Sequence, residues 1–203
     1  MIQLKAFHGT SWKNGQSILC EKSFHTGDSE KLRMGVGAYF FCKAGSKEDY
    51  PIRCAKELEK YHWKQGKRDE KYAILSCEIE CDEEKYFDLY DPQMLEYFHQ
   101  MRYIILNRAL SADPNYKYQS AAAADAQVFD IIRRIRQVGV IRCPQYFGMF
   151  AEESKFVFRE RPTFPKTYVP NVIMACVDTN IATIKNIELV EEGSYDNEYD
   201  SFI

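Results

Sequence analysis

The residues best suited to chemistry lie in two short segments near the start of the chain. The first is Phe-His-Gly-Thr at residues 7–10, and the second is Gly-Ala-Tyr-Phe at residues 37–40. The imidazole of His8 can hydrogen-bond a hydroxyl group, and Gly9, having no Cβ, lets a ligand approach the backbone. The ring of Tyr39 offers a flat face for stacking. Each feature alone is usually structural, but their combination indicates a pocket for a molecule with a ring and hydroxyls.

The sequence around these residues predicts the elements that position them. Residues 2–8 alternate apolar and polar side chains, which is typical of a strand with one covered face. Thr10 or Ser11 can cap the helix that follows. Residues 37–41 form an apolar run, so we expect a buried strand there, and we expect a helix over residues 47–65.

The rest of the pattern predicts strands at both ends of the chain and helices between them. Strands are expected over residues 72–81, 86–89 (a short strand or a turn), 172–177 and 181–190, and helices over residues 92–106 and 121–138. Arg133, Arg134 and Arg136 lie off the apolar stripe of the last helix, so we expect them on a solvated face. This order favours an α+β fold with a mainly antiparallel sheet. We expect one domain over residues 1–190 and a frayed acidic tail over residues 191–203.

Composition indicates which partners, cellular environment and metal sites to expect. Of the 203 residues, 45% are hydrophobic and 28% charged, which is ordinary for a globular domain, and the net charge of −3 offers no overall attraction to nucleic acid. The sequence shows neither a run of membrane-spanning length nor the apolar core of a signal peptide, so we expect a cytoplasmic protein without a membrane partner. The 7 cysteines match no metal-ligand spacing, so we expect reduced thiols and no metal site.

The two opening segments, in this order, resemble the His–Tyr class of poly(ADP-ribose) polymerase-like ADP-ribosyltransferases. The resemblance spans most of residues 5–190 and includes Ile18-Leu19, Phe24, Cys54-Ala55 and residues 86–89. It implies a split antiparallel sheet with flanking helices, and NAD as the substrate. His8 would bind the nicotinamide ribose, Gly9 the carboxamide, and Tyr39 would stack on the nicotinamide ring. Thr10 and Tyr50 are further pocket residues by this resemblance.

The third catalytic position of that family is a glutamate in members that synthesise polymers. Placing residues 171–180 on the family's corresponding strand puts Ile173 or Met174 at this position, and neither is an acid. Members that transfer a single ADP-ribose often carry an apolar residue there, so the resemblance implies single transfer. Alternatively the carboxylate comes from elsewhere, and the candidates are Glu152, Glu153, Glu78 and Glu80. We favour Glu152 because it directly precedes the terminal strands.

We therefore expect a mono-ADP-ribosyltransferase that uses NAD to modify a macromolecular acceptor, protein or nucleic acid, and releases nicotinamide. By analogy with small bacterial members, we expect a toxin or antiviral-defence role with an antitoxin or regulatory protein as partner. One alternative is a degenerate domain of the same fold that binds NAD or ADP-ribose without turnover. Another is an RNA 2′-phosphotransferase of related fold, which needs more pocket arginines and histidines than we can place.

Overall fold

The computed structural model describes residues 1–24, 26, 33–43, 49–66, 71–117, 120–145 and 172–195. Glu152 and Glu153 lie outside these ranges, so the preferred source of a catalytic carboxylate has no structural description. The strands are β1 (Ile2–Ser11), β2 (Ala38–Cys42), β3 (Lys71–Cys81), β4 (Tyr86–Asp88), β5 (Val140–Gln145), β6 (Val172–Val177) and β7 (Thr183–Ser194). The helices are α1 (Trp12–Glu21), α2 (Tyr50–Lys64), α3 (Pro92–Ala112) and α4 (Ala121–Arg136), with a short 3-10 helix, η1 (Glu83–Lys85).

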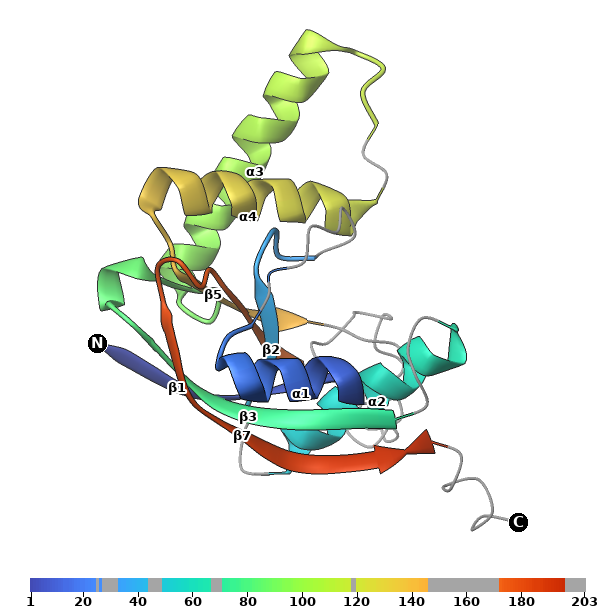
Figure 1. Ribbon diagram of the computed structural model, residues 1–203. Coiled ribbons are helices and arrows are strands. Elements are labelled where there is room, and N and C mark those ends of the chain that lie inside the picture. The colour runs from blue at the N-terminus through green and yellow to red at the C-terminus, as the bar shows by residue number, and fades with distance from the viewer. Residues whose placement is uncertain are drawn as a thin grey trace, which may run out of the picture.

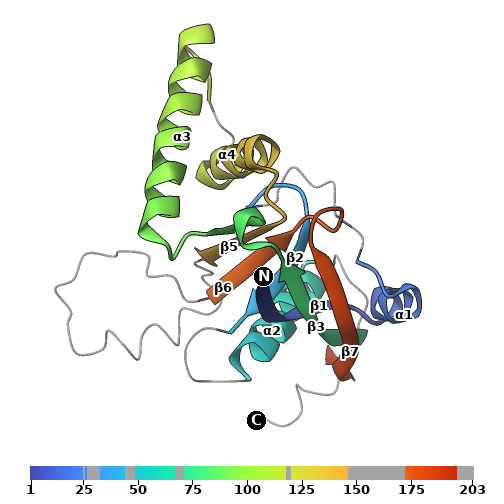
Figure 2. The ribbon, with the colours of Figure 1, turned by 90° about the vertical axis from the view of Figure 1, so that its left-hand side faces the viewer.

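The strands form one seven-stranded sheet in the order β4-β5-β6-β2-β1-β3-β7. Its neighbouring strands run antiparallel except β4 and β5, which are parallel. Helices α3 and α4 lie beside each other near the β4–β5 edge, while α1 and α2 lie toward the other end (Figures 1 and 2). The fold is thus mixed α+β with a mainly antiparallel sheet, as the sequence predicts.

The sheet divides between its two central strands. β1 and β2 pair at only two positions, Ala6 with Cys42 and Phe7 with Phe41. Beyond them β1 continues along β3 as far as Ser11, while β2 stays paired with β6 over its whole length. We call the region where they part, between residues 8–10 of β1 and residues 38–40 of β2, the split. It lies where the two opening sequence segments meet.

Local sequence explains where the helices begin. The side chains of Ser11, Asp91 and Ser120 accept hydrogen bonds from backbone N–H groups in the first turns of α1, α3 and α4. A proline occupies the first turn of α2, where the missing N–H has no intrahelical partner to lose. These starts match the predicted ones to within a few residues.

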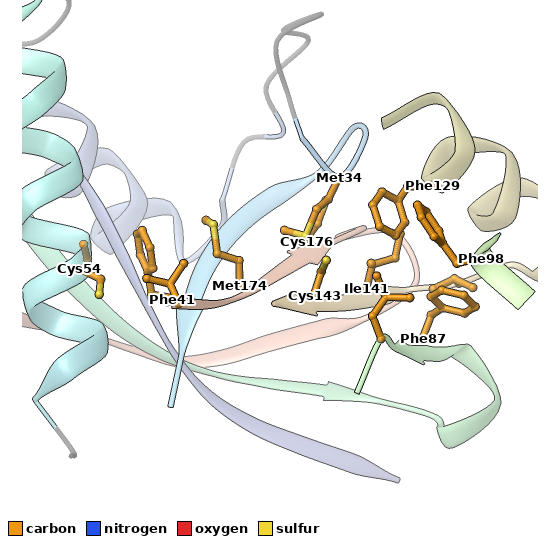
Figure 3. Close-up of a cluster of buried hydrophobic side chains, with 14 of the residues drawn as sticks. Met34, Phe41, Cys54, Phe87, Phe98, Phe129, Ile141, Cys143, Met174 and Cys176 are labelled. Atoms are coloured by element: carbon orange, nitrogen blue, oxygen red, sulfur yellow. The ribbon is translucent and has the colours of Figure 1, made fainter. Parts of the chain in front are cut away.

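Two apolar clusters cover the two faces of the sheet, because side chains alternate along each strand. One cluster joins Phe41, Met174 and Cys176 to residues of α2, α3 and α4, and Figure 3 shows Phe98 and Phe129 reaching it from the two long helices. The other joins Phe40 and the alternate residues of β6 to α1 and Phe24. We call these the α4-side cluster and the α1-side cluster.

Two expectations differ from the structure. β7 pairs with β3 as far as Ser194, and Tyr195 is 1% exposed. Its ring stacks on those of Tyr72 and Trp63 at 4.7 and 5.4 Å, so the fold continues past the expected boundary at residue 190. Arg133 is 7% exposed and not on a solvated face. Its guanidinium bonds to backbone carbonyls of other elements, an interaction that helical periodicity cannot reveal.

Candidate functional site

His8 joins β1 to β2 across the split. Its ring is half-buried and lies against Phe24 and Phe40, with ring centres 5.2 and 5.6 Å away, and Nδ1 is 2.8 Å from the carbonyl oxygen of Tyr39. Because a carbonyl only accepts hydrogen bonds, Nδ1 must carry the proton. In the neutral ring Nε2 is then the acceptor nitrogen, which is suited to receive a hydrogen bond from a hydroxyl.

The direction of the Gly9 backbone follows from this bond. The carbonyl of Tyr39 points toward β1. Alternate residues of a strand point their backbone N–H and C=O to the same edge, so the backbone groups of Phe41 also point toward β1. Phe41 opposes Phe7, and opposed residues of an antiparallel pair face each other or both turn away. The backbone N–H and C=O of Phe7 therefore point toward β2. Gly9, two residues further along, presents one donor and one acceptor to the split.

Helix α2 explains why residue 9 is a glycine. A Cβ at Gly9 would lie 2.5 Å from the carbonyl oxygen of Ala55 and 2.9 Å from Cγ of Glu59. Glu59 is only 3% exposed, and its Oε1 lies 3.3 Å from Nδ1 of His62. Glu59 follows buried Ala55 by one helical turn, and this spacing is the signal in the sequence that could have pointed to it. The α2 side of Gly9 is thus covered, while its backbone edge faces the split.

Tyr39 lies on the other face of the sheet from His8. Its ring packs against the α4-side cluster, whereas His8 contacts Phe24 and Phe40 of the α1-side cluster. The phenol donates to the carbonyl of Gly35 at 2.7 Å and accepts from the N–H of Met34 at 2.9 Å. Burial, with a further contribution from Cys176, raises the pKa of Tyr39, so the phenol stays protonated and keeps donating.

Tyr50 shares a face with Tyr39. It begins α2 and packs against the same α4-side cluster. The guanidinium carbon of Arg53 lies 5.4 Å from the centre of its ring, and burial, followed by Cys54, raises the pKa of its phenol. The structure therefore brings the two predicted aromatic residues to one face of the sheet and His8 to the other.

Three other predicted site residues, Thr10, Ile173 and Met174, are buried. Thr10 is 3% exposed, and its methyl group faces Gly15 of α1. Ile173 and Met174 are 7% and 4% exposed and belong to opposite clusters, so they point to opposite faces of β6. No residue of β6 carries a carboxylate. This strand supplies apolar surface, and no acid, at the position that the resemblance assigns to the third catalytic residue.

A hollow of about 320 Å³ opens at the edge of the sheet formed by β3 and β7. It is lined by Trp12, Lys71, Tyr72, Glu192, Gly193 and Ser194. None of the predicted site residues lines it. Within the described ranges, no group of three or more His, Cys, Asp or Glu side chains could hold a metal ion, and no helix there has the length and apolar character to cross a membrane.

Comparison with known proteins gives one distant similarity. The chain is 23% identical over 205 residues to an uncharacterized protein of Methanocaldococcus jannaschii, and the alignment covers 92% of this chain and 87% of that protein. No protein-family model and no solved structure matches the chain.

Proposed function

We propose that the split is a nicotinamide-nucleotide site and that the protein transfers single ADP-ribose units from NAD to a macromolecular acceptor. The observation that carries this proposal is the orientation of His8 and Gly9. In this proposal His8 places its acceptor nitrogen, Nε2, beside the split, and Gly9 presents its backbone N–H and C=O to the split. A carboxamide, which has one acceptor and two donor hydrogens, is complementary to such an edge.

In this proposal each residue has a separate task. The backbone of Gly9 holds the carboxamide, Nε2 of His8 accepts from a hydroxyl of the nicotinamide ribose, and Tyr39 with Tyr50 supplies aromatic surface for the ring. The bond between ribose C1′ and nicotinamide nitrogen breaks, and nicotinamide leaves as a neutral molecule with the bonding electrons. A nucleophile of the acceptor bonds to C1′ and loses its proton. Fixed dipoles around the ribose stabilise the oxocarbenium-like transition state.

The apolar third position supports single transfer over polymer synthesis. Ile173 and Met174 are buried on opposite faces of β6 and offer no group to activate the hydroxyl of a growing chain. The same observation favours one other candidate, a domain that binds NAD or ADP-ribose without turnover. The two functions share the split and differ only in whether the C1′ bond breaks.

Transfer of label separates these candidates. We would incubate the protein with NAD labelled on its adenylate part and cell lysate, then count label in the protein and nucleic acid fractions. The proposal predicts label in one fraction, in amounts that exceed those of boiled enzyme. NAD binding without label in any fraction would favour the binding domain, and no NAD binding by wild type would remove both functions.

Two substitutions at His8 test the site itself. In His8→Asn the side-chain amide can still donate to the Tyr39 carbonyl but lacks an acceptor at the position of Nε2, so we expect folding to be retained and NAD binding to weaken at least tenfold. His8→Ala removes both groups. His99→Asn on α3, where His99 is exposed, is the matched control and should bind NAD like wild type. Equal NAD affinity in His8→Asn and wild type would rule out the assigned role of Nε2.

A further inference from the structure

The turn that enters β2 is held by two side chains of α4. The N–H of Val36 donates to Oδ1 of Asp130 at 2.9 Å, and the carbonyl of Val36 accepts from Nη1 of Arg133. Residues 130 and 133 are three apart and so project from one face of the helix. They bind the donor and the acceptor of a single residue, and we call this pair the α4 clamp.

The clamp includes a buried charge. Arg133 is 7% exposed, and its Nη2 donates to the carbonyl of Cys176 on β6 at 3.3 Å. A buried guanidinium is unfavourable unless its hydrogens are bonded. Here Nη1 and Nη2 bond to backbone carbonyls of two segments far from α4 in the sequence, while Nε is buried with no hydrogen-bond partner among the described residues. Arg133 therefore ties α4, the turn and β6 into one arrangement.

Both glycines of the turn are required by this contact. Gly35 has φ of +79°, and a Cβ there would collide with the carboxylate of Asp130. A Cβ on Gly37 would lie 2.6 Å from Sγ of Cys176 and 3.2 Å from Nη1 of Arg133. The Gly-x-Gly pattern thus allows α4 and β6 to approach the turn closely.

The clamp extends to Tyr39 through the same turn. The Tyr39 phenol bonds to Met34 N–H and Gly35 carbonyl, the residues immediately before Val36. We propose that Asp130 and Arg133 are positioning residues, which fix the turn and through it the Tyr39 ring at the split. The assignment to ligand binding rests on the proposed function, whereas the mechanical link between α4 and Tyr39 stands without it.

The mechanical link is tested without ligand by amide hydrogen exchange of Met34 and Val36. Asp130→Ala should speed exchange at both amides at least tenfold, because Val36 loses its acceptor and the Tyr39 phenol loses its fixed position. Asp130→Asn keeps an oxygen acceptor and should stay within about threefold of wild type. If Asp130→Ala does not fold, Asp130→Glu, which displaces the acceptor by one methylene, takes its place.

Asp125→Ala is the matched control. Asp125 lies on the same helix and binds Nε of Arg102 on α3 at 2.7 Å, with a side-chain exposure of 35%. Removing it breaks a bond between helices that does not touch the turn, so exchange at Met34 and Val36 should not change. Unchanged exchange in Asp130→Ala, or equal acceleration in Asp125→Ala, would overturn the link.

NAD affinity then tests the positioning role. We expect Asp130→Ala to weaken NAD binding about tenfold, with affinity rescued in Asp130→Asn and unchanged in Asp125→Ala. In a Tyr39→Leu background the additional substitution Asp130→Ala should cause no further loss, since its effect passes through Tyr39. Fast exchange with wild-type NAD affinity, or full additivity with Tyr39→Leu, would overturn the positioning role. If wild type binds no NAD, the proposed function fails, and the exchange result alone decides the link.

Discussion

In the proposed site His8 has two tasks, a bond between β1 and β2 and a bond to the ligand, and such tasks are rarely visible from sequence. One ring nitrogen bonds β1 to the Tyr39 carbonyl, and in the neutral ring this bond makes the other nitrogen the acceptor. The sequence indicated the histidine but not the bond, because the partner is a backbone group 31 positions away. A half-buried histidine needs a partner for its N–H in any case, so the bond to Tyr39 fixes the tautomer, and the ligand role of Nε2 is tested separately by His8→Asn.

The structure gives Gly9 a packing role in addition to the ligand role proposed for it. The expected reason for a glycine at this position was ligand approach, but the structure adds the close contact with α2. Glu59 shows the limit of pattern reading, because glutamates are seldom buried, so its spacing from Ala55 is only a weak signal that it is an inner residue of α2. Its burial becomes apparent only when α2 packs on β1.

Gly9→Ala should destabilise the protein by about 3 kcal/mol, the upper end for overpacking. The added methyl meets the carbonyl oxygen of Ala55 at 2.5 Å, a backbone atom that cannot move without shifting α2. Gly66→Ala is the control, because a Cβ there meets no atom within 4 Å and carries only the strain of its φ of +66°, about 1 kcal/mol. Urea unfolding measures both, and equal losses would contradict the packing explanation.

At the scale of elements, periodicity was a good guide where one face of a strand or helix is buried. It predicted β1, β3, α3 and α4 to within a few residues at their starts, since apolar spacing and caps are local signals. It did not predict that Arg133 turns inward, or that β7 continues to Ser194. Both depend on partners in other elements, which local patterns do not contain.

The end of β7 provides a direct stability test. Tyr195→Ala should lose about 3 kcal/mol or more, the usual effect of removing a buried aromatic ring, because its ring stacks between Tyr72 and Trp63. Tyr195→Phe keeps the stacking and loses a 3.5 Å bond to the Lys56 carbonyl, so its loss should stay below about 1 kcal/mol. Thermal and urea unfolding should rank the two variants in that order. A small loss in Tyr195→Ala would place the boundary of the domain back before residue 195.

At the scale of the whole molecule, the division of the sheet connects fold with function. The sequence predicts an α+β domain. The segments that carry His8 and Tyr39 lie on β1 and β2, the two strands that separate. The sequence does not predict which face of the sheet carries each of the two side chains, because that depends on the register of β1 against β2. The register places His8 with the α1-side cluster and Tyr39 with the α4-side cluster, so a ligand in the split would contact both halves of the sheet.

The most direct test of the central claim is a two-dimensional amide NMR spectrum of the protein titrated with NAD. The account predicts saturable shifts at the amides of Gly9 and Tyr39, which border the split, and no comparable shifts around the hollow lined by Trp12 and Gly193. Nicotinamide alone should shift the Gly9 amide in the same direction. A titration that leaves Gly9 and Tyr39 unchanged, or that shifts residues of the hollow instead, would contradict the assignment of the split as the nucleotide site.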